Sequence, residues 1–462
     1  MTNSVKHTLS GSTESLDWLA VMLMRLAWSS LTVLSCAVFY FFAWRRFESH
    51  LIIVLVGSVL LCFAWFVLRP LFRWPVLEDR GAAKVSAMLV GLMALGISLR
   101  IGFVLLNPPV QTSDFLSYWD AAGRLLSTGS YTYSVSEQTM RAFRPPGYPA
   151  FLAALFWMVG ENPWIPTVTN ILFYGVTSAF SYLLAVHFGG RRAGVIAVLV
   201  LAVWPQSIAI TGLAASEPVG TALFTVATYT YLRAIKGSRA CLIGTGILTG
   251  CGVLIRPALI VLPVLWLLHA LMDREHPRAA FRAAFIATVV MVATLTPWMA
   301  RNYLVLDAVV PVSTNGGSVF YRANNPMATG DYTTRGERDL DQFAYDEVLW
   351  NKTGFEWGKQ WIIKNPVAFL RLAVRKEATL LGGDWGIFWY ALTPSKEFDA
   401  DDPVFRMVGL YADAWWLFVW ALILCGLTGM RERFTKNADG ATVLWMTMFF
   451  VVVHSVFESQ MR

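Results

Sequence analysis

The chain alternates between long apolar runs and shorter polar intervals over almost its whole length. Since a helix needs about 20 mostly apolar residues to cross a bilayer, the runs predict about eleven membrane-spanning helices. Several of the later runs are short, so these helices need tilting or local thinning of the bilayer. The spans are expected near residues 18–44, 51–68, 85–106, 166–188, 194–210, 218–231, 240–255, 258–272, 283–300, 405–427 and 441–456.

Two long polar intervals, 107–165 and 301–403, divide these runs. The pattern predicts an all-α polytopic membrane protein in four parts. Residues 1–84 form a cytoplasmic N-terminus with two helices, and residues 85–300 form a helical module that includes the first polar interval. Residues 301–403 form a second polar domain, and residues 404–462 form the C-terminal helices.

Positive charge gives the orientation, because Lys and Arg concentrate in cytoplasmic loops. If the interval 107–165 lies outside, five of the loops on the opposite side are basic, and only Arg45–Arg46 are misplaced. Both long polar intervals are therefore expected to be extracytoplasmic. The five loops contain Arg69, Arg73, Arg80 and Lys84; Arg191 and Arg192; Arg233, Lys236 and Arg239; Arg274, Arg278 and Arg282; and Arg431, Arg433 and Lys436.

Composition supports the membrane assignment. The chain is 56% hydrophobic and 15% charged, whereas soluble domains are about 25% charged. A soluble enzyme, a disordered protein and a disulfide-rich scaffold are excluded. The net charge of +7 is spread over short loops, which argues against a nucleic-acid partner. The five cysteines lie inside apolar runs without a C-x-x-C pair, so neither a disulfide framework nor a zinc site is expected.

Four ionisable residues lie in or beside predicted spans: Arg25, Arg100, His187 and His269. Arg25 and Arg100 are each close enough to the end of a span for the side chain to reach the interface. The histidines are expected to be interfacial residues and not metal ligands.

The first polar interval offers an acid, Asp114, in the first turn of a helix that Thr112 or Ser113 would cap. Tyr118 follows at i+4 and shares its face. A capping acid, favoured there by the helix dipole, is the simpler interpretation of Asp114 alone.

The same interval ends in residues 144–149, RPPGYP, followed by the short apolar stretch 150–159. The prolines fix an extended chain before a helix that is too short to span and is expected to lie along the interface. Arg144, held at headgroup depth, suits a lipid phosphate. The alternative is an interfacial anchor.

Further acidic and basic residues are predicted on the same external side. Glu217 precedes Pro218 at the mouth of a span, where it is either a hydrated helix-start acid or a substrate contact. Arg256 and Arg301 lie at the other external ends, and turn signals around Asn315 and Asn325 open the second polar interval.

In order and spacing, these motifs resemble those of bacterial relatives of protein O-mannosyltransferases and aminoarabinose transferases. These are polyprenyl-phosphate-sugar-dependent glycosyltransferases of the C superfamily. The similarity covers roughly residues 85–332, with a late external segment at 454–458. It rests on Asp114 with Tyr118 and Ala122, RPPGYP at 144–149, SEP at 216–218, IRP at 255–257, PWMARN at 297–302, NGG at 315–317 and NNP at 324–326.

The resemblance implies a glycosyltransferase-C-like fold with an outward-facing active site. It implies that Asp114 and Glu217 are the catalytic acids and that Arg144 binds the donor phosphate. Arg256 and Arg301 are further candidates for the phosphate. Tyr118, Tyr148, Asn325 and Glu458 are expected to line the substrate site.

Three departures from the family pattern qualify this. Asp114 lacks the neighbouring Glu that many relatives carry, which argues against a metal held by an acidic pair. No cofactor is expected, and a divalent metal is compatible with the acids but not indicated. Two extra spans precede the family's usual start, and the chain ends where relatives continue, so a truncated C-terminus is expected.

The sequence therefore predicts a multi-pass protein of the bacterial inner membrane that transfers a sugar from a polyprenyl-phosphate donor, with inversion. The acceptor hydroxyl would belong to a glycan, a lipid or a protein on the extracytoplasmic face. A transporter or flippase, or a polymerase of lipid-linked saccharides, is the alternative. The sequence discloses neither the sugar nor the acceptor.

Overall fold

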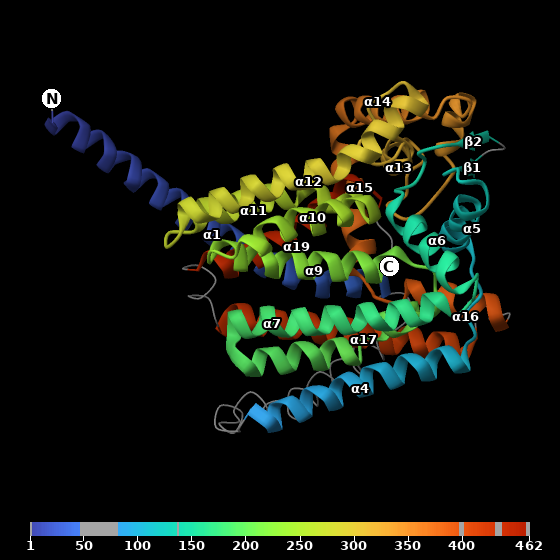
Figure 1. Cartoon of the computed structure of the whole chain (residues 1–462), viewed down its shortest axis with the longest axis horizontal. Coiled ribbons are helices and arrows are strands. Elements are labelled where there is room, and N and C mark those ends of the chain that lie inside the picture. The colour runs from blue at the N-terminus through green and yellow to red at the C-terminus, as the bar shows by residue number, and fades with distance from the viewer. Residues whose placement is uncertain (1, 47–81, 136–137, 397–401, 430–436, 459–462) are drawn as a thin grey trace.

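The computed structural model describes residues 2–46, 82–135, 138–396, 402–429 and 437–458. Long helices lie side by side, and a group of shorter elements gathers at one end of them (Figure 1). The long helices and their connectors are α1 (Thr2–Arg46), α4 (Ala82–Leu106), α7 (Ile165–Ala202), α8 (Pro205–Ala209), η1 (Ile210–Gly212), α9 (Ser216–Ile235), α10 (Arg239–Ile255), η2 (Pro257–Val261), α11 (Leu262–Met272), α12 (Pro277–Leu306), α17 (Pro403–Gly429) and α19 (Ala438–Val456).

The elements at the end of the bundle come from the two long polar intervals. The first interval gives two helices and a ribbon in which Tyr133 pairs with Met140. The second interval gives four helices and a 3-10 turn. These elements are α5 (Ser113–Thr128), β1 (Tyr133–Val135), β2 (Gln138–Met140), α6 (Gly147–Val159), α13 (Gly316–Ala323), η3 (Glu337–Phe343), α14 (Glu347–Lys364), α15 (Pro366–Leu381) and α16 (Gly386–Lys396).

The predicted all-α polytopic architecture is confirmed, but the count of eleven spans is not. Within the described ranges, six helices are long and apolar enough to cross a membrane: α1, α4, α7, α12, α17 and α19. Helix α9 is too polar to qualify, and α10 and α11 are too short. The span expected at 51–68 lies outside the described residues.

Helix α7 contains two of the predicted spans. Its chain reverses at Gly190, which has φ 79° and ψ −178°, so the two halves run antiparallel in Figure 1. Only glycine adopts these angles without strain. The turn carries Arg191 and Arg192, as expected of a cytoplasmic loop.

Two predictions about charged residues were wrong. Arg100 does not reach the interface: it is 1% exposed and donates to the carbonyls of Gly96, Leu201 and Ala202 and to Ser207 Oγ. It satisfies carbonyls at the end of α7, which would otherwise lack partners.

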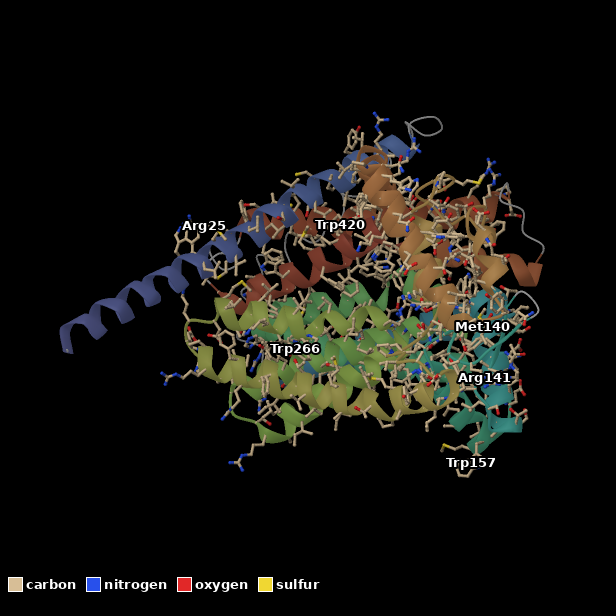
Figure 2. The ribbon with its side chains drawn as sticks, turned by 90° about the horizontal axis from the view of Figure 1, so that it is seen from above. Arg25, Met140, Arg141, Trp157, Trp266 and Trp420 are labelled. Atoms are coloured by element: carbon tan, nitrogen blue, oxygen red, sulfur yellow. The ribbon has the colours of Figure 1, made fainter. Side chains whose placement is uncertain are left out.

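His269 is not interfacial either, because it is fully buried. Its Nε2 lies 2.7 Å from Asp439 Oδ1, and His187 Nε2 lies 2.6 Å from Asp439 Oδ2. The three side chains join α7, α11 and α19. Arg25, by contrast, is exposed and points away from the helices in Figure 2.

A buried apolar cluster fixes the first external segment on the helix ends. Phe115 of α5 and Leu152 of α6 pack with Leu213 and Val219, which precede and begin α9. The predicted short helix after RPPGYP is present as α6. Its tip stays exposed, with 77% of Trp157 accessible (Figure 2), as suits a helix lying along an interface.

Candidate active site

The first acid–arginine pair joins Asp114 to Arg144. Helix α5 begins at Ser113, so Asp114 stands in its first turn, and Arg144 Nη2 donates to Asp114 Oδ1 at 2.8 Å. The guanidinium also lies 5.4 Å from the ring centre of Tyr118. Burial alone would lower the pKa of Arg144, but Tyr118 and Asp114 together raise it above its ordinary value. Arg144 therefore stays charged.

The segment that carries Arg144 is held from both sides. The Tyr131 hydroxyl donates to the carbonyls of Arg144 and Pro145. Gly147 packs on the end of α10, where an added Cβ would lie 2.7 Å from Ile255. The segment that carries Arg144 therefore packs on the residue that precedes Arg256.

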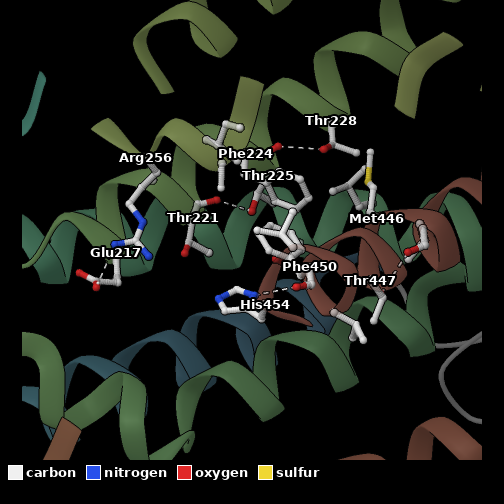
Figure 3. A pocket seen from close by; sticks show the side chains of 18 of the residues that line it. Glu217, Thr221, Phe224, Thr225, Thr228, Arg256, Met446, Thr447, Phe450 and His454 are labelled. Carbon is white, nitrogen blue, oxygen red and sulfur yellow. Dashed lines mark hydrogen bonds and ion pairs between the residues drawn. The ribbon is translucent and has the colours of Figure 1, made fainter. Parts of the chain in front are cut away.

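The second pair joins Glu217 of α9 to Arg256. Arg256 Nη1 donates to Glu217 Oε1 at 3.1 Å and to Ser216 Oγ at 3.3 Å (Figure 3). The aliphatic stem of Arg256 lies on Gly220, where a Cβ would come within 2.6 Å. The glycine therefore permits the close approach of Arg256 to α9.

Two tyrosines connect the pairs. The rings of Tyr118 and Tyr148 meet edge to face at 5.4 Å. Tyr148 is 1% exposed, and its hydroxyl has no hydrogen-bond partner among the described residues. Burial, and then the charges of Glu217 and Tyr118, raise the pKa of Tyr148. Both acids therefore lie near one tyrosine pair.

A long cavity of about 750 Å³ begins at the second pair. Glu217, Arg256 and His454 lie at its outer end, and apolar side chains line the rest. Since Glu217 and Thr228 both line it, three turns apart on α9, the cavity extends about 16 Å along the helix. It ends near Val443, one turn from Asp439.

A small cavity of about 470 Å³ lies beside the long cavity and shares Glu217, Thr221, Leu380 and Trp416 with it. It extends toward Arg100 and Asp384. Neither cavity is lined by Asp114 or Arg144, so the first pair lies outside both cavities.

Three further predicted site residues make structural contacts. Arg301 donates to the carbonyls of Arg141 and Tyr131 and lies over the Trp298 ring. Asn325 is 1% exposed and hydrogen-bonds within its own turn, to Tyr321, Arg322 and Met327. Glu458 pairs with Arg322 at 2.6 Å. None of the three lines either cavity.

Sequence reasoning missed the group around Arg322. This arginine pairs with Glu337 and Glu458 and lies 4.9 Å from the ring centre of Tyr332. Burial raises the pKa of Tyr332; Arg322 opposes this, whereas Glu337, Glu458 and Asp114 add to it. Tyr332 therefore lies close enough to Asp114 for the charge of this acid to act on it.

Two other missed residues are His454 and Asp384. His454 Nδ1 lies 2.6 Å from the Phe450 carbonyl, and the residue lines the head of the long cavity. Asp384 accepts from Trp204 Nε1 at 2.8 Å in the small cavity. His454 begins the late segment 454–458 of the family resemblance but is not among the predicted site residues, and no motif marks Asp384. Within the described part of the chain, no three His, Cys, Asp or Glu side chains are grouped to hold a metal ion.

The segment that contains Arg144 and Arg256 matches a known protein family. Residues 143–300 match the family described as dolichyl-phosphate-mannose-protein mannosyltransferase. The resemblance drawn from the motifs is thus confirmed over this segment, which includes Arg144, Tyr148, Glu217 and Arg256. It begins after Asp114 and ends before Arg301.

Among solved structures, the chain is similar to the crystal structure of ArnT from Cupriavidus metallidurans bound to undecaprenyl phosphate. The two are 15% identical, with a TM-score of 0.43 over 81% of this chain and 77% of that one. No curated protein matches the chain.

Proposed function

We propose that this protein is a membrane glycosyltransferase that moves a sugar from a polyprenyl-phosphate donor to an acceptor hydroxyl on the extracytoplasmic face. The observation that carries the proposal is that two acid–arginine pairs are connected through Tyr118 and Tyr148, and that the second pair, Glu217 with Arg256, lies at the head of a long apolar cavity. The match to a family described by its dolichyl-phosphate-mannose donor supports it.

The prenyl chain would occupy the long cavity, whose wall is mostly apolar. The single phosphate would then lie at the cavity head, against Arg256 and within reach of Arg144. Guanidinium groups suit this task because they stay charged and bind phosphate oxygens in pairs.

The reaction is a direct displacement at the anomeric carbon. The acceptor oxygen forms a bond to this carbon as its proton passes to Asp114. The bond from the carbon to the phosphate oxygen breaks, and its electron pair leaves with polyprenyl phosphate. Attack from the side opposite the leaving group inverts the anomeric centre. Arg144 and Arg256 offset the charge that develops on the phosphate.

Asp114 is the proposed base because it stands on the external side, from which an acceptor arrives. Glu217, at the junction of the two cavities, is placed to orient the sugar. The acceptor remains a glycan, a lipid or a protein, and the location a bacterial inner membrane with the site facing outward.

The test is transfer by the purified protein in lipid nanodiscs, with polyprenyl-phosphate mannose and arabinose as radiolabelled donors and membrane extracts as acceptors. We expect one polyprenyl phosphate to be released for each sugar transferred. Asp114→Asn should lower kcat by about 10²–10⁴-fold, the range of a general base. Asp120→Asn, at an exposed position of the same helix, is the control and should keep wild-type activity.

Activity of Asp114→Asn within about threefold of wild type would exclude the base role. Turnover of a nucleotide sugar, or movement of an intact lipid-linked sugar across the bilayer, would overturn the transferase itself.

A further inference from the structure

The small cavity carries an inference of its own, which rests on the proposed function. It lies between α4, α7, α9 and the α8–η1 segment and has the size of a ligand site, which typically measures about 300–1,000 Å³. Its polar lining includes Asn170, Gln206, Glu217 and Asp384, and its aromatic lining Tyr174, Trp204 and Trp416.

Two acceptor atoms of this lining are buried without a partner in the described structure: Asn170 Oδ1 and Glu217 Oε2. The orientation of Asn170 is fixed, because its Nδ2 donates to the carbonyls of Ile210, Thr211 and Leu213. Buried polar atoms in proteins nearly always have a partner. The complementary ligand therefore presents hydrogen-bond donors, as hydroxyl groups do.

The cavity is not built for a phosphate. Arg100 lines it, but its guanidinium is already bound by three carbonyls and a hydroxyl and stacks 3.6 Å from the Tyr174 ring centre. The carboxylate of Glu217 would repel an anion. The arginine that is placed to meet a phosphate, Arg256, lies at the head of the long cavity instead.

We propose that the small cavity holds the sugar ring of the donor. Its hydroxyl groups would donate to Asn170 Oδ1 and Glu217 Oε2, and its apolar faces would pack on the indole rings of Trp204 and Trp416. Because the two cavities meet at Glu217, a donor whose prenyl chain fills the long cavity has its sugar–phosphate bond at this carboxylate. The same hydroxyl chemistry occurs in an acceptor glycan, so the test must separate the two sources.

Cavity-filling substitutions give that test, because Ile210 lines only the small cavity and Thr447 only the long cavity. Binding is measured in nanodiscs by isothermal calorimetry with three probes: polyprenyl phosphate, polyprenyl-phosphate mannose and polyprenyl-phosphate arabinose. We expect wild type to bind at least one sugar-bearing probe about tenfold more tightly than the bare lipid, roughly the effect of one net hydrogen bond to a charged group.

Ile210→Phe should abolish this preference while leaving the affinity for polyprenyl phosphate within about twofold. Thr447→Phe should weaken all three probes alike. Ile210→Val is the matched control and should keep the preference. Thr177→Leu fills the same cavity from α7 and serves as the second variant if Ile210→Phe does not fold.

An unchanged preference in Ile210→Phe and Thr177→Leu, or an equal loss for all three probes, would overturn the inference. If these two variants kept the donor affinity of wild type but had a raised KM for the acceptor, the inference would also be overturned, because the small cavity would then bind the acceptor glycan. Failure of wild type to bind even bare polyprenyl phosphate would instead contradict the proposed function, and the inference with it.

Discussion

At the scale of single residues, the site is defined by which charges meet. Asp114 and Arg144 are 30 positions apart in the sequence, and Glu217 and Arg256 are 39 apart. The first pair joins α5 to the segment before α6, and the second joins the start of α9 to the end of α10. The arginines are the groups whose replacement should separate donor binding from chemistry.

We expect Arg144→Ala to reduce kcat/KM by about 10²-fold, the cost of losing one buried charge-assisted contact. A raised KM with unchanged kcat would mean that Arg144 binds the phosphate in the ground state. A lowered kcat would mean that Arg144 stabilises the charge that develops on the phosphate in the transition state. Arg144→Lys should recover part of the loss, because it restores the charge without the planar fork.

The control is Arg141→Ala, an exposed arginine in the same segment, which should stay within about twofold of wild type. Steady-state kinetics at varied donor concentration measure all three variants. Full activity of Arg144→Ala would remove Arg144 from the donor site.

How much of the site the sequence predicts follows from these contacts. Asp114, Tyr118, Arg144, Glu217 and Arg256 could be found because each stands beside a helix start, a proline or a turn at the external end of a span. Their pairing could not, since it depends on how α5 packs beside the segment 144–149 and how α9 packs on α10. Arg322 and Asp384 have no local signal, because they meet Glu458 and Trp204, which lie far from them along the chain.

At the scale of elements, the sequence predicted the helix positions better than their number. Apolar runs located α9 to α12 well, because their ends coincide with prolines and basic loops. The same runs could not show that Arg100 would turn inward to satisfy carbonyls at the end of α7, because that depends on the reversal at Gly190.

Gly190→Ala tests this reversal. A residue with a Cβ is strained at φ 79°, so we expect a loss of about 1–3 kcal/mol in stability. The loss would appear as a lower midpoint in a thermal melt followed by size-exclusion chromatography. Gly91→Ala, at an open position on α4, should not lower the midpoint. Equal melts for both variants would contradict a strained turn.

The contact between α15 and α19 predicts a dependence on pH. Burial raises the pKa of the Glu377 carboxyl from 4.5 to about 7, although Ser455 and Lys376 oppose this. Because the folded protein favours the protonated acid, this group stabilises the fold fully below pH 4.5. The contribution is lost as the pH rises toward 7.

Glu377→Gln keeps a polar group beside Ser455 but does not ionise. Between pH 5 and 8 we therefore expect the midpoint of wild type to fall relative to that of the variant, by on the order of 1–3 °C. Glu356→Gln, an exposed control on α14, should follow wild type. If the midpoints of wild type and Glu377→Gln changed in parallel with pH, ionisation of Glu377 would not be the cause of the fall in midpoint.

At the scale of the whole molecule, the two polar intervals gather at one end of the helices (Figure 1). The turn at Gly190 and the basic loops after α9 and α11 belong to the other end. The proposed reaction requires the first end to face outward, where nucleotide sugars are normally absent and a lipid carrier is needed.

Single cysteines, introduced after the native five are replaced, test this orientation. Ser134→Cys and Thr334→Cys should react with an impermeant maleimide added to intact cells, and Lys236→Cys and Glu275→Cys only after permeabilisation. Ser134, Thr334, Lys236 and Glu275 are all exposed, so protection by packing does not confuse the result. The reverse pattern would place the site in the cytoplasm.

The pairing of each arginine with a carboxylate has a kinetic consequence. In the resting protein, Asp114 is occupied by Arg144, and Glu217 shares Arg256. In the proposed reaction, a phosphate that binds these guanidinium groups breaks both ion pairs, and only then does Asp114 accept a proton. Binding of the donor is therefore needed before Asp114 can act as a base, which favours an ordered cycle in which the donor binds before the acceptor. When polyprenyl phosphate leaves, both ion pairs form again. Asp114 is then paired with Arg144, so it does not take a proton from water in the empty site.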